Sequence, residues 1–134
     1  MTADLGQAFR LVINGATYTA SGNCLQSGNL NDAVSEATYV CGTTLKARSH
    51  SRSITFDFSL AVQDSDHAIL TTLTPGTNNV TDLVIQPNGT TTGNIKITST
   101  DTSILSRPVS WGSTELITID CSARLNNITI GGNT

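Results

Sequence analysis

The longest run of alternating side chains lies near the middle of the chain. From position 54 to position 63, apolar residues take every second place, and polar or small residues lie between them. The apolar members are Ile54, Phe56, Phe58, Leu60 and Val62. Because successive side chains of a strand point to opposite faces, this period of two predicts a strand with one buried face.

The period changes directly after this strand. Ile69, Leu70 and Leu73 follow at helical spacing, and Pro75 then ends the pattern. A short helix with so narrow an apolar stripe is not stable by itself in water. We therefore expect it to pack on the sheet that contains the strand, with the other strands arranged around this pair.

The predicted helix begins with polar residues that suit the free N–H groups of a first turn. Asp64 or Ser65 is expected to cap the helix, and Asp66 lies where the helix dipole favours a negative charge. The helical segment is accordingly expected to span residues 64–73.

Other segments predict strands joined by turns. Asn14-Gly15 between two alternating segments is a strong local signal for a β-hairpin, so residues 9–20 are expected to form one. Residues 102–105 are expected to continue the ladder of residues 94–100. Further strands are expected at residues 38–45, 80–86, 109–111, 114–125 and 127–130. With about seven or eight strands and one helix, the sequence predicts a mainly β fold, a β-sandwich or half-barrel.

Residues 21–36 are rich in Gly, Asn and Ser. We expect a long connection here, with at most a short strand near Cys24 and Leu25, because these residue types favour turns and weaken strands. Structureless loops longer than about a dozen residues are usually functional or become ordered on assembly. The segment is therefore a candidate recognition loop.

Four basic residues precede the long strand at alternate positions. They are Lys46, Arg48, His50 and Arg52. If the chain is extended there, all four side chains point the same way, in line with Phe56 and Phe58. If residues 49–51 form a turn, which is the arrangement we favour, the basic groups gather at the tip of a long hairpin. They then form a soluble strand edge, a docking surface for acidic groups of a neighbouring subunit, or a contact with nucleic acid.

Length and charge narrow the class of protein. The chain has 134 residues, which suits one domain spanning residues 1–134. The net charge is −3 and the sequence pI is about 5.0, which argues against a protein that coats nucleic acid by bulk charge. No apolar run is as long as a membrane span and no signal peptide opens the chain, so we expect synthesis in the cytoplasm and no membrane partner.

Catalytic and metal-binding patterns are absent from the sequence. Asp64, Ser65, Asp66 and His67 contain the residue types of a triad, but neighbours on one helical turn point in different directions. No spacing of His, Cys or carboxylates suggests a metal site, and no glycine-rich phosphate loop opens a helix. We therefore expect no catalytic, cofactor-binding or metal-binding residues, and no cofactor.

The three cysteines, Cys24, Cys41 and Cys121, form no CxxC pair. We expect three half-buried thiols, because synthesis in a reducing compartment disfavours disulfides. Whether two of them pair stays open at this stage.

The order of elements resembles that of the tail tube proteins of long-tailed bacteriophages. The residues that carry the resemblance lie at positions 53–58, 64–73, 75–77, 80–85 and 94–99. The likeness covers most of the chain and concerns architecture, since no motif in it is specific. It implies a β-sandwich with a flanking helix, and hexameric rings stacked into a tube. Two long hairpins per subunit then join an inner barrel around a lumen through which DNA leaves the capsid.

The resemblance also implies partners and a location. The partners are further copies of the chain, other tail proteins, and DNA that passes transiently and without sequence preference, in a virion tail whose proteins are made in the host cytoplasm. The candidates for inter-subunit contacts are Lys46, Arg48, His50, Arg52, Asp64 and Asp66. The basic residues suit a ring-to-ring or subunit contact better than a slippery lumen.

Three other functions remain open from the sequence. One is a tail terminator or a head decoration protein with a similar sandwich. Another is a receptor-binding or glycan-binding module that uses residues 21–36 and the region of Trp111. The third is a small hydrolase that uses Asp66 and His67.

Overall fold

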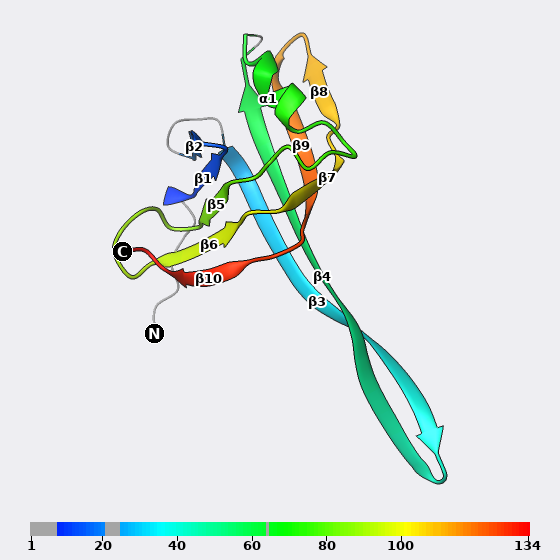
Figure 1. Cartoon of the computed structure of the whole chain (residues 1–134). Coiled ribbons are helices and arrows are strands. Elements are labelled where there is room, and N and C mark those ends of the chain that lie inside the picture. Colours follow the sequence, from blue (N-terminus) through cyan, green and yellow to red (C-terminus); the bar gives the residue numbers. More distant parts are fainter. Residues whose placement is uncertain (1–7, 21–24, 64) are drawn as a thin grey trace.

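Two antiparallel sheets and one short helix make up the fold (Figure 1). The computed structural model describes residues 8–20, 25–63 and 65–134, except for the side chains of residues 49 and 50. Each sheet has five strands. The predicted mainly β class is confirmed, and no closed barrel forms within the described part of the chain.

The first sheet has the strand order β10-β6-β5-β1-β2. Its strands are β1 (Arg10–Ile13), β2 (Ala16–Thr19), β5 (Leu83–Gln86), β6 (Ile95–Ser99) and β10 (Thr129–Gly132). The predicted hairpin at Asn14-Gly15 is confirmed, with φ angles of 49° and 86° at the two turn residues. Such positive angles match the twist of paired strands, and Asn and Gly tolerate them best.

The second sheet contains the long strands. They are β3 (Leu25–Cys41), β4 (Thr44–Val62), β7 (Thr102–Ser106), β8 (Val109–Gly112) and β9 (Glu115–Leu125). The order is β3-β4-β9-β7, and β8 also pairs with β9. The predicted alternation in β4 is confirmed, because Ile54, Phe56, Phe58 and Leu60 are all buried.

The core lies between the two sheets. Leu11 of β1 and Ile85 of β5 belong to the same buried cluster as Phe56 of β4 and Ile119 of β9. The rings of Phe56 and Phe58 stack with centroids 5.1 Å apart. Both rings belong to β4. Because full burial of a large apolar side chain contributes about 1.5–3 kcal/mol, the buried cluster shared by the two sheets holds the body of the protein together.

The helix is shorter than predicted. It is α1 (His67–Thr72), with Asp66 as its N-cap residue, so Ser65 is not the cap. No side chain caps the helix: the Asp66 carboxylate instead accepts a hydrogen bond from the backbone N–H of Gln63, at 2.9 Å. Asp64 lies outside the described residues. The predicted packing is confirmed, since Ile69 and the adjacent Leu73 are buried in the core.

The segment after β6 does not continue its ladder as expected. β7 pairs with β9 in the second sheet instead, and an isolated bridge joins Thr102 to Val80. The chain therefore crosses between sheets near Asp101, whose backbone carbonyl accepts hydrogen bonds from Asn126 N and from the Ser99 hydroxyl.

The predicted loop at residues 21–36 is wrong from Leu25 onward, where β3 begins; residues 21–24 lie outside the described residues. Its Ser, Asn and Gly residues have weak strand propensity. They form a strand because β4 pairs with β3 from Leu25 to Cys41, with two register shifts on the way. Pairing with a long neighbour overrides local propensity in such a case.

The predicted turn at residues 49–51 is also wrong. The chain stays extended there, and the turn lies at Gly42 and Thr43, between β3 and β4. Gly42 has a φ of 64°, a conformation that glycine adopts without steric cost.

Candidate assembly surfaces

The strands β3 and β4 leave the sandwich together as a two-stranded ribbon (Figure 1). The pairing of β4 with β9 ends at Thr55, so from Thr44 to Ile54 β4 pairs with β3 alone. At about 3.3 Å per residue this stretch extends about 35 Å. An isolated two-stranded ribbon is marginally stable in water, so a ribbon of this length indicates a surface that is completed by a partner.

A β-bulge interrupts the ribbon at His50. Ser35 pairs with Ser51, but Glu36 pairs with Ser49, so β4 carries one extra residue at this point. A one-residue shift moves every following side chain to the other face of a strand. The bulge therefore changes which basic residues lie together.

The predicted alignment of the basic residues is wrong for this reason. Arg52 pairs with Val34 and shares the face of Phe56, whereas Lys46 and Arg48 lie beyond the bulge on the opposite face. The side chain of His50 is outside the described part of the structure. The structure thus separates the basic residues into two sets.

Arg52 is engaged within its own chain. Its Nε donates to Asp32 Oδ1 at 2.8 Å and its Nη2 donates to Asp32 Oδ2. The hydrogen bond from Arg52 lowers the pKa of the Asp32 carboxyl below its usual value. Lys46 and Arg48 form no ion pair with any described residue, so their charges are available to another molecule.

The predicted contact residues Asp64 and Asp66 lie away from this basic set. Asp66 is at the start of α1, at the opposite end of β4 from the ribbon (Figure 1), and Asp64 lies outside the described residues. The structure therefore does not bring the six candidates into one site.

The exposed face of the second sheet is polar. In register across three strands, Asp57 lies between Asn29 and Ser122, and Ser59 lies beside Asp120. A shallow trough of about 400 Å³ runs over this face. Hydroxyls, the Asn29 amide and the carboxylates of Asp57 and Asp120 line it together with apolar atoms, and Arg124 lies on the same face opposite Thr55.

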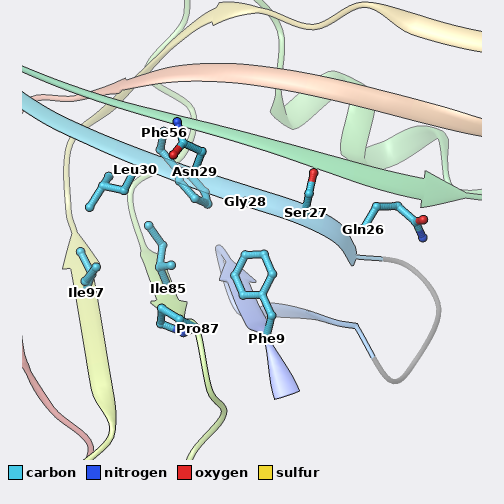
Figure 2. A pocket seen from close by; sticks show the side chains of 10 residues that line it. All are labelled: Phe9, Gln26, Ser27, Gly28, Asn29, Leu30, Phe56, Ile85, Pro87 and Ile97. Carbon is cyan, nitrogen blue, oxygen red and sulfur yellow. The ribbon is translucent and has the colours of Figure 1, made fainter. Parts of the chain in front are cut away.

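A second hollow, of about 320 Å³, lies between the two sheets (Figure 2). Apolar side chains such as Phe9, Phe56 and Ile85 line it, and none of its lining residues titrates near neutral pH. Gly28 forms part of its wall, where a Cβ atom would come within 2.6 Å of the Phe9 ring. The hollow therefore offers apolar packing and no acid–base chemistry.

The two residues of the hydrolase alternative, Asp66 and His67, lie at the start of α1. His67 and Asp66 line a small hollow of about 160 Å³ with apolar neighbours, and the Asp66 carboxylate is bonded to the backbone of Gln63. No group of three or more metal-ligating side chains occurs among the residues described. The same residues include no helix with the length and apolar character needed to cross a bilayer.

Two cysteines fall in the described residues, and both are free thiols. Cys41 is exposed beside the ribbon turn, and Cys121 is buried in β9, where burial raises its pKa to about 12. The prediction of half-buried thiols is wrong for both. Cys24 lies outside the described residues.

Solved structures match this fold over nearly the whole chain. A chain in the cap that terminates the tube of the anti-feeding prophage is 15% identical, with a TM-score of 0.71, over 97% of this chain and 92% of that one. A chain in the extended sheath–tube complex of the extracellular contractile injection system PVC is 11% identical, with a TM-score of 0.71, over 94% and 89%. A chain in the tail of an empty gene transfer agent particle, solved with C6 symmetry, is 10% identical, with a TM-score of 0.60, over 96% of each.

The chain has the fold of tail tube and tube cap proteins. The resemblance predicted from the order of elements is confirmed at this level. Identities of 10–15% establish the fold alone. No family model and no curated protein matches the sequence.

Within this tail tube fold, sequence reasoning missed the free edge formed by β3 and the exposed apolar residues of the ribbon. Val34, Val40 and Leu45 are exposed although they are strongly apolar. Of the three, only Val34 lies in the segment predicted as a loop, and its β-branched side chain was the available signal for a strand there. The strand pattern was not detected because few of the surrounding residues are apolar.

Proposed function

We propose that the chain is a structural subunit of a phage-like tail tube. Copies assemble into hexameric rings, and the rings stack around a channel through which DNA passes during ejection. The proposed site of assembly is a virion or tail-like particle, and other tail proteins bind its ends.

The observation that carries this proposal is the open edge of β3. This strand of 17 residues pairs with β4 alone among the described strands, so its other edge has no partner strand from Ser27 to Cys41. A long free edge of this kind is a ready template for pairing with another chain. The opposite edge of the same sheet consists of the short strands β7 and β8.

Joining these two edges between neighbouring copies makes one continuous sheet around a ring. Because the two edges differ, the contact is heterologous, and a heterologous contact closes into a ring when the rotation allows it. Six copies is the number we propose, supported by the C6 symmetry of the gene transfer agent tail that shares the fold.

The proposed lumen face is the polar one that carries Asn29, Asp57 and Asp120. Carboxylates and neutral hydroxyls bind phosphate groups poorly, so DNA slides past such a wall without being held. The net charge of −3 also disfavours binding of the DNA phosphates. By register, the side chains of Lys46 and Arg48 belong to this face. The two strands of the ribbon cross once before they reach their turn (Figure 1). We place Lys46 and Arg48 at a contact between subunits.

A second candidate function is that of a tube terminator. It is favoured by the match to a tube-terminating cap, which is as good as the match to the sheath–tube complex. The receptor-binding alternative is weaker, because β3 takes up most of the segment that would have supplied its recognition loop.

Electron microscopy of the purified protein tests both proposals. At high protein concentration, and at both low and high salt, a tube subunit should form rings with a central hole and stacks of them. A terminator should form single rings that do not stack but bind the ends of tubes. Monomers alone under all these conditions would contradict the proposed function.

A further inference from the structure

Strand β10 lies on the edge of the first sheet without burying any of its own side chains. Among the described strands it pairs only with β6, from Thr129 opposite Thr98 to Gly132 opposite Ile95. All its residues are exposed, and its one large apolar side chain, Ile130, is 61% exposed. Burial of apolar surface therefore contributes little to the attachment of this strand.

The residue after β10, Asn133, is buried and only 6% exposed. Its Nδ2 donates hydrogen bonds to Gly89 O at 2.8 Å and to Thr91 O at 3.0 Å. Its Oδ1 accepts a hydrogen bond from Gln86 Nε2 at 2.8 Å. We call these three partners, Gln86, Gly89 and Thr91, the socket of Asn133.

The loop between β5 and β6 shapes this socket. Gly89 and Gly93 in the loop have φ angles of 78° and 89°, which glycine adopts without steric cost. The backbone of Asn133 also binds the loop, because its N–H donates to Asn94 O at 2.8 Å and its carbonyl accepts from Gly93 N at 2.9 Å. Figure 1 shows the end of β10 beside this loop. Asn133 thus attaches β10 through its side chain and its backbone.

A second buried side chain supports the socket. Gln86 is 5% exposed, and its Oε1 accepts a hydrogen bond from Arg10 Nη1 of β1. This bond leaves the Gln86 Nε2 group directed at Asn133. Because buried polar groups are costly to leave unpaired, the series from Arg10 through Gln86 to Asn133 favours one position of β10.

The strand that Asn133 attaches covers a sheet edge. If β10 leaves, β6 loses its partner on that side and exposes N–H and C=O groups. A free edge of this kind is a template for pairing with another chain, and short edge strands are one means by which proteins protect it.

We propose that β10 is a guard strand latched by Asn133. The latch holds β10 over the edge of β6, and β10 opens and closes as a local unit while the sandwich stays folded. The guard keeps this edge of the first sheet closed, whereas the edge of β3 in the second sheet is open. The latch lies within the first sheet, so it does not depend on whether copies of the chain form rings.

Hydrogen exchange measured by mass spectrometry tests the inference. Asn133→Ala removes the three side-chain hydrogen bonds, so β10 and the N–H groups of β6 that face it should exchange about tenfold to a hundredfold faster. Strands β1, β4 and β9 should keep their rates, because they do not pair with β10. Asn133→Leu should give the same acceleration, because it keeps the approximate size of the side chain but forms no hydrogen bond.

Asn88→Ala is the matched control. It removes the same kind of side chain from the loop that forms the socket, and the Asn88 side chain forms no hydrogen bond with any described residue. Its exchange rates should equal those of the unmodified protein. Unchanged rates in Asn133→Ala would show that this side chain is no latch. Equal acceleration in every strand would show that β10 does not open separately, and either result overturns the inference.

Gln86→Met tests the support behind the latch. It removes the hydrogen bond to Asn133 Oδ1 without changing β10, so the exchange of β10 should accelerate by a smaller factor than in Asn133→Ala. The double variant should exchange more slowly than the product of the two factors predicts, because both changes break the same bond. A full product would show that the two residues act independently and would overturn the proposed latch.

Discussion

Arg52 binds Asp32 through two hydrogen bonds that cross the β3–β4 ribbon. The bond joins neighbours on adjacent strands at the point where the ribbon leaves the sandwich. This ion pair engages the charge of Arg52, which the spacing of the basic residues had indicated was available to a partner. Among its described side chains, the ribbon therefore carries one internal ion pair and, beyond it, the unpaired basic groups of Lys46 and Arg48.

The ion pair predicts a pH effect. The pKa of Asp32 is lowered in the folded protein from its ordinary 3.8, so the pair stabilises the fold above that pH and the contribution is lost as pH falls through the folded value. Replacing Arg52 with Gln should move the Asp32 pKa back toward 3.8. A carboxyl titration followed by NMR measures this, and an unchanged pKa would contradict the assigned cause.

Gly28 is predicted to tolerate no side chain. A Cβ at this position would lie 2.6 Å from the Phe9 ring, so Gly28→Ala should destabilise the fold by about 1–3 kcal/mol in chemical unfolding. Gly131→Ala is the matched control, because no atom lies within 4 Å of its Cβ position and the change should be nearly neutral. Equal stability of the two variants would show that Phe9 does not pack as described.

Asn14 is predicted to act both through its φ angle and through its side chain. Its Oδ1 accepts hydrogen bonds from the N–H groups of Thr81 and Asp82, and its Nδ2 donates to Asn79 O. Asn14→Ala should cost about 2–3 kcal/mol, because it loses these bonds and a φ of 49° disfavours Ala.

Asn14→Gly separates the two effects. Glycine keeps the backbone angle without strain but removes the side chain, so its cost should be smaller, about 1–2 kcal/mol. Thermal or denaturant unfolding of both variants makes the comparison. A larger loss for glycine than for alanine would contradict the role given to the φ angle.

Thiol labelling is predicted to report assembly. In a Cys24→Ser background, Cys41 should react rapidly with a maleimide, while Cys121 should not, because it is buried and its pKa of about 12 keeps it protonated at neutral pH. On assembly, Cys41 should become protected, because it is the last residue of β3, whose open edge is then covered by a neighbouring copy. Labelling at the same rate before and after assembly would place this end of β3 outside the contact.

The elements that could be predicted from the sequence are those set by local geometry. The alternation from Ile54 to Leu60 fixes which side chains face the core, because neighbouring residues of any strand point to opposite faces. The Asn14-Gly15 turn follows from the φ angles that only a few residues accept.

The candidate site could be predicted only in part. Lys46 and Arg48 do project away from the body, as the spacing indicated, but the bulge at His50 places Arg52 on the other face. Registers are set by pairing between strands, and no local pattern marks the residue at which the pairing shifts. The exposed apolar residues of the second sheet, such as Val40 and Trp111, were missed because they form surfaces only when the strands are placed.

The sequence by itself determined the mainly β class, the buried face of the long strand, the first hairpin, and the presence of a short helix after that strand. Each depends on residues close together in the chain. Only the tertiary structure decided that the polar segment from Leu25 is a strand, that β7 joins the second sheet, and that Arg52 binds Asp32. These features depend on hydrogen bonds and contacts between distant segments, whose energies exist only once the partner strand is in place.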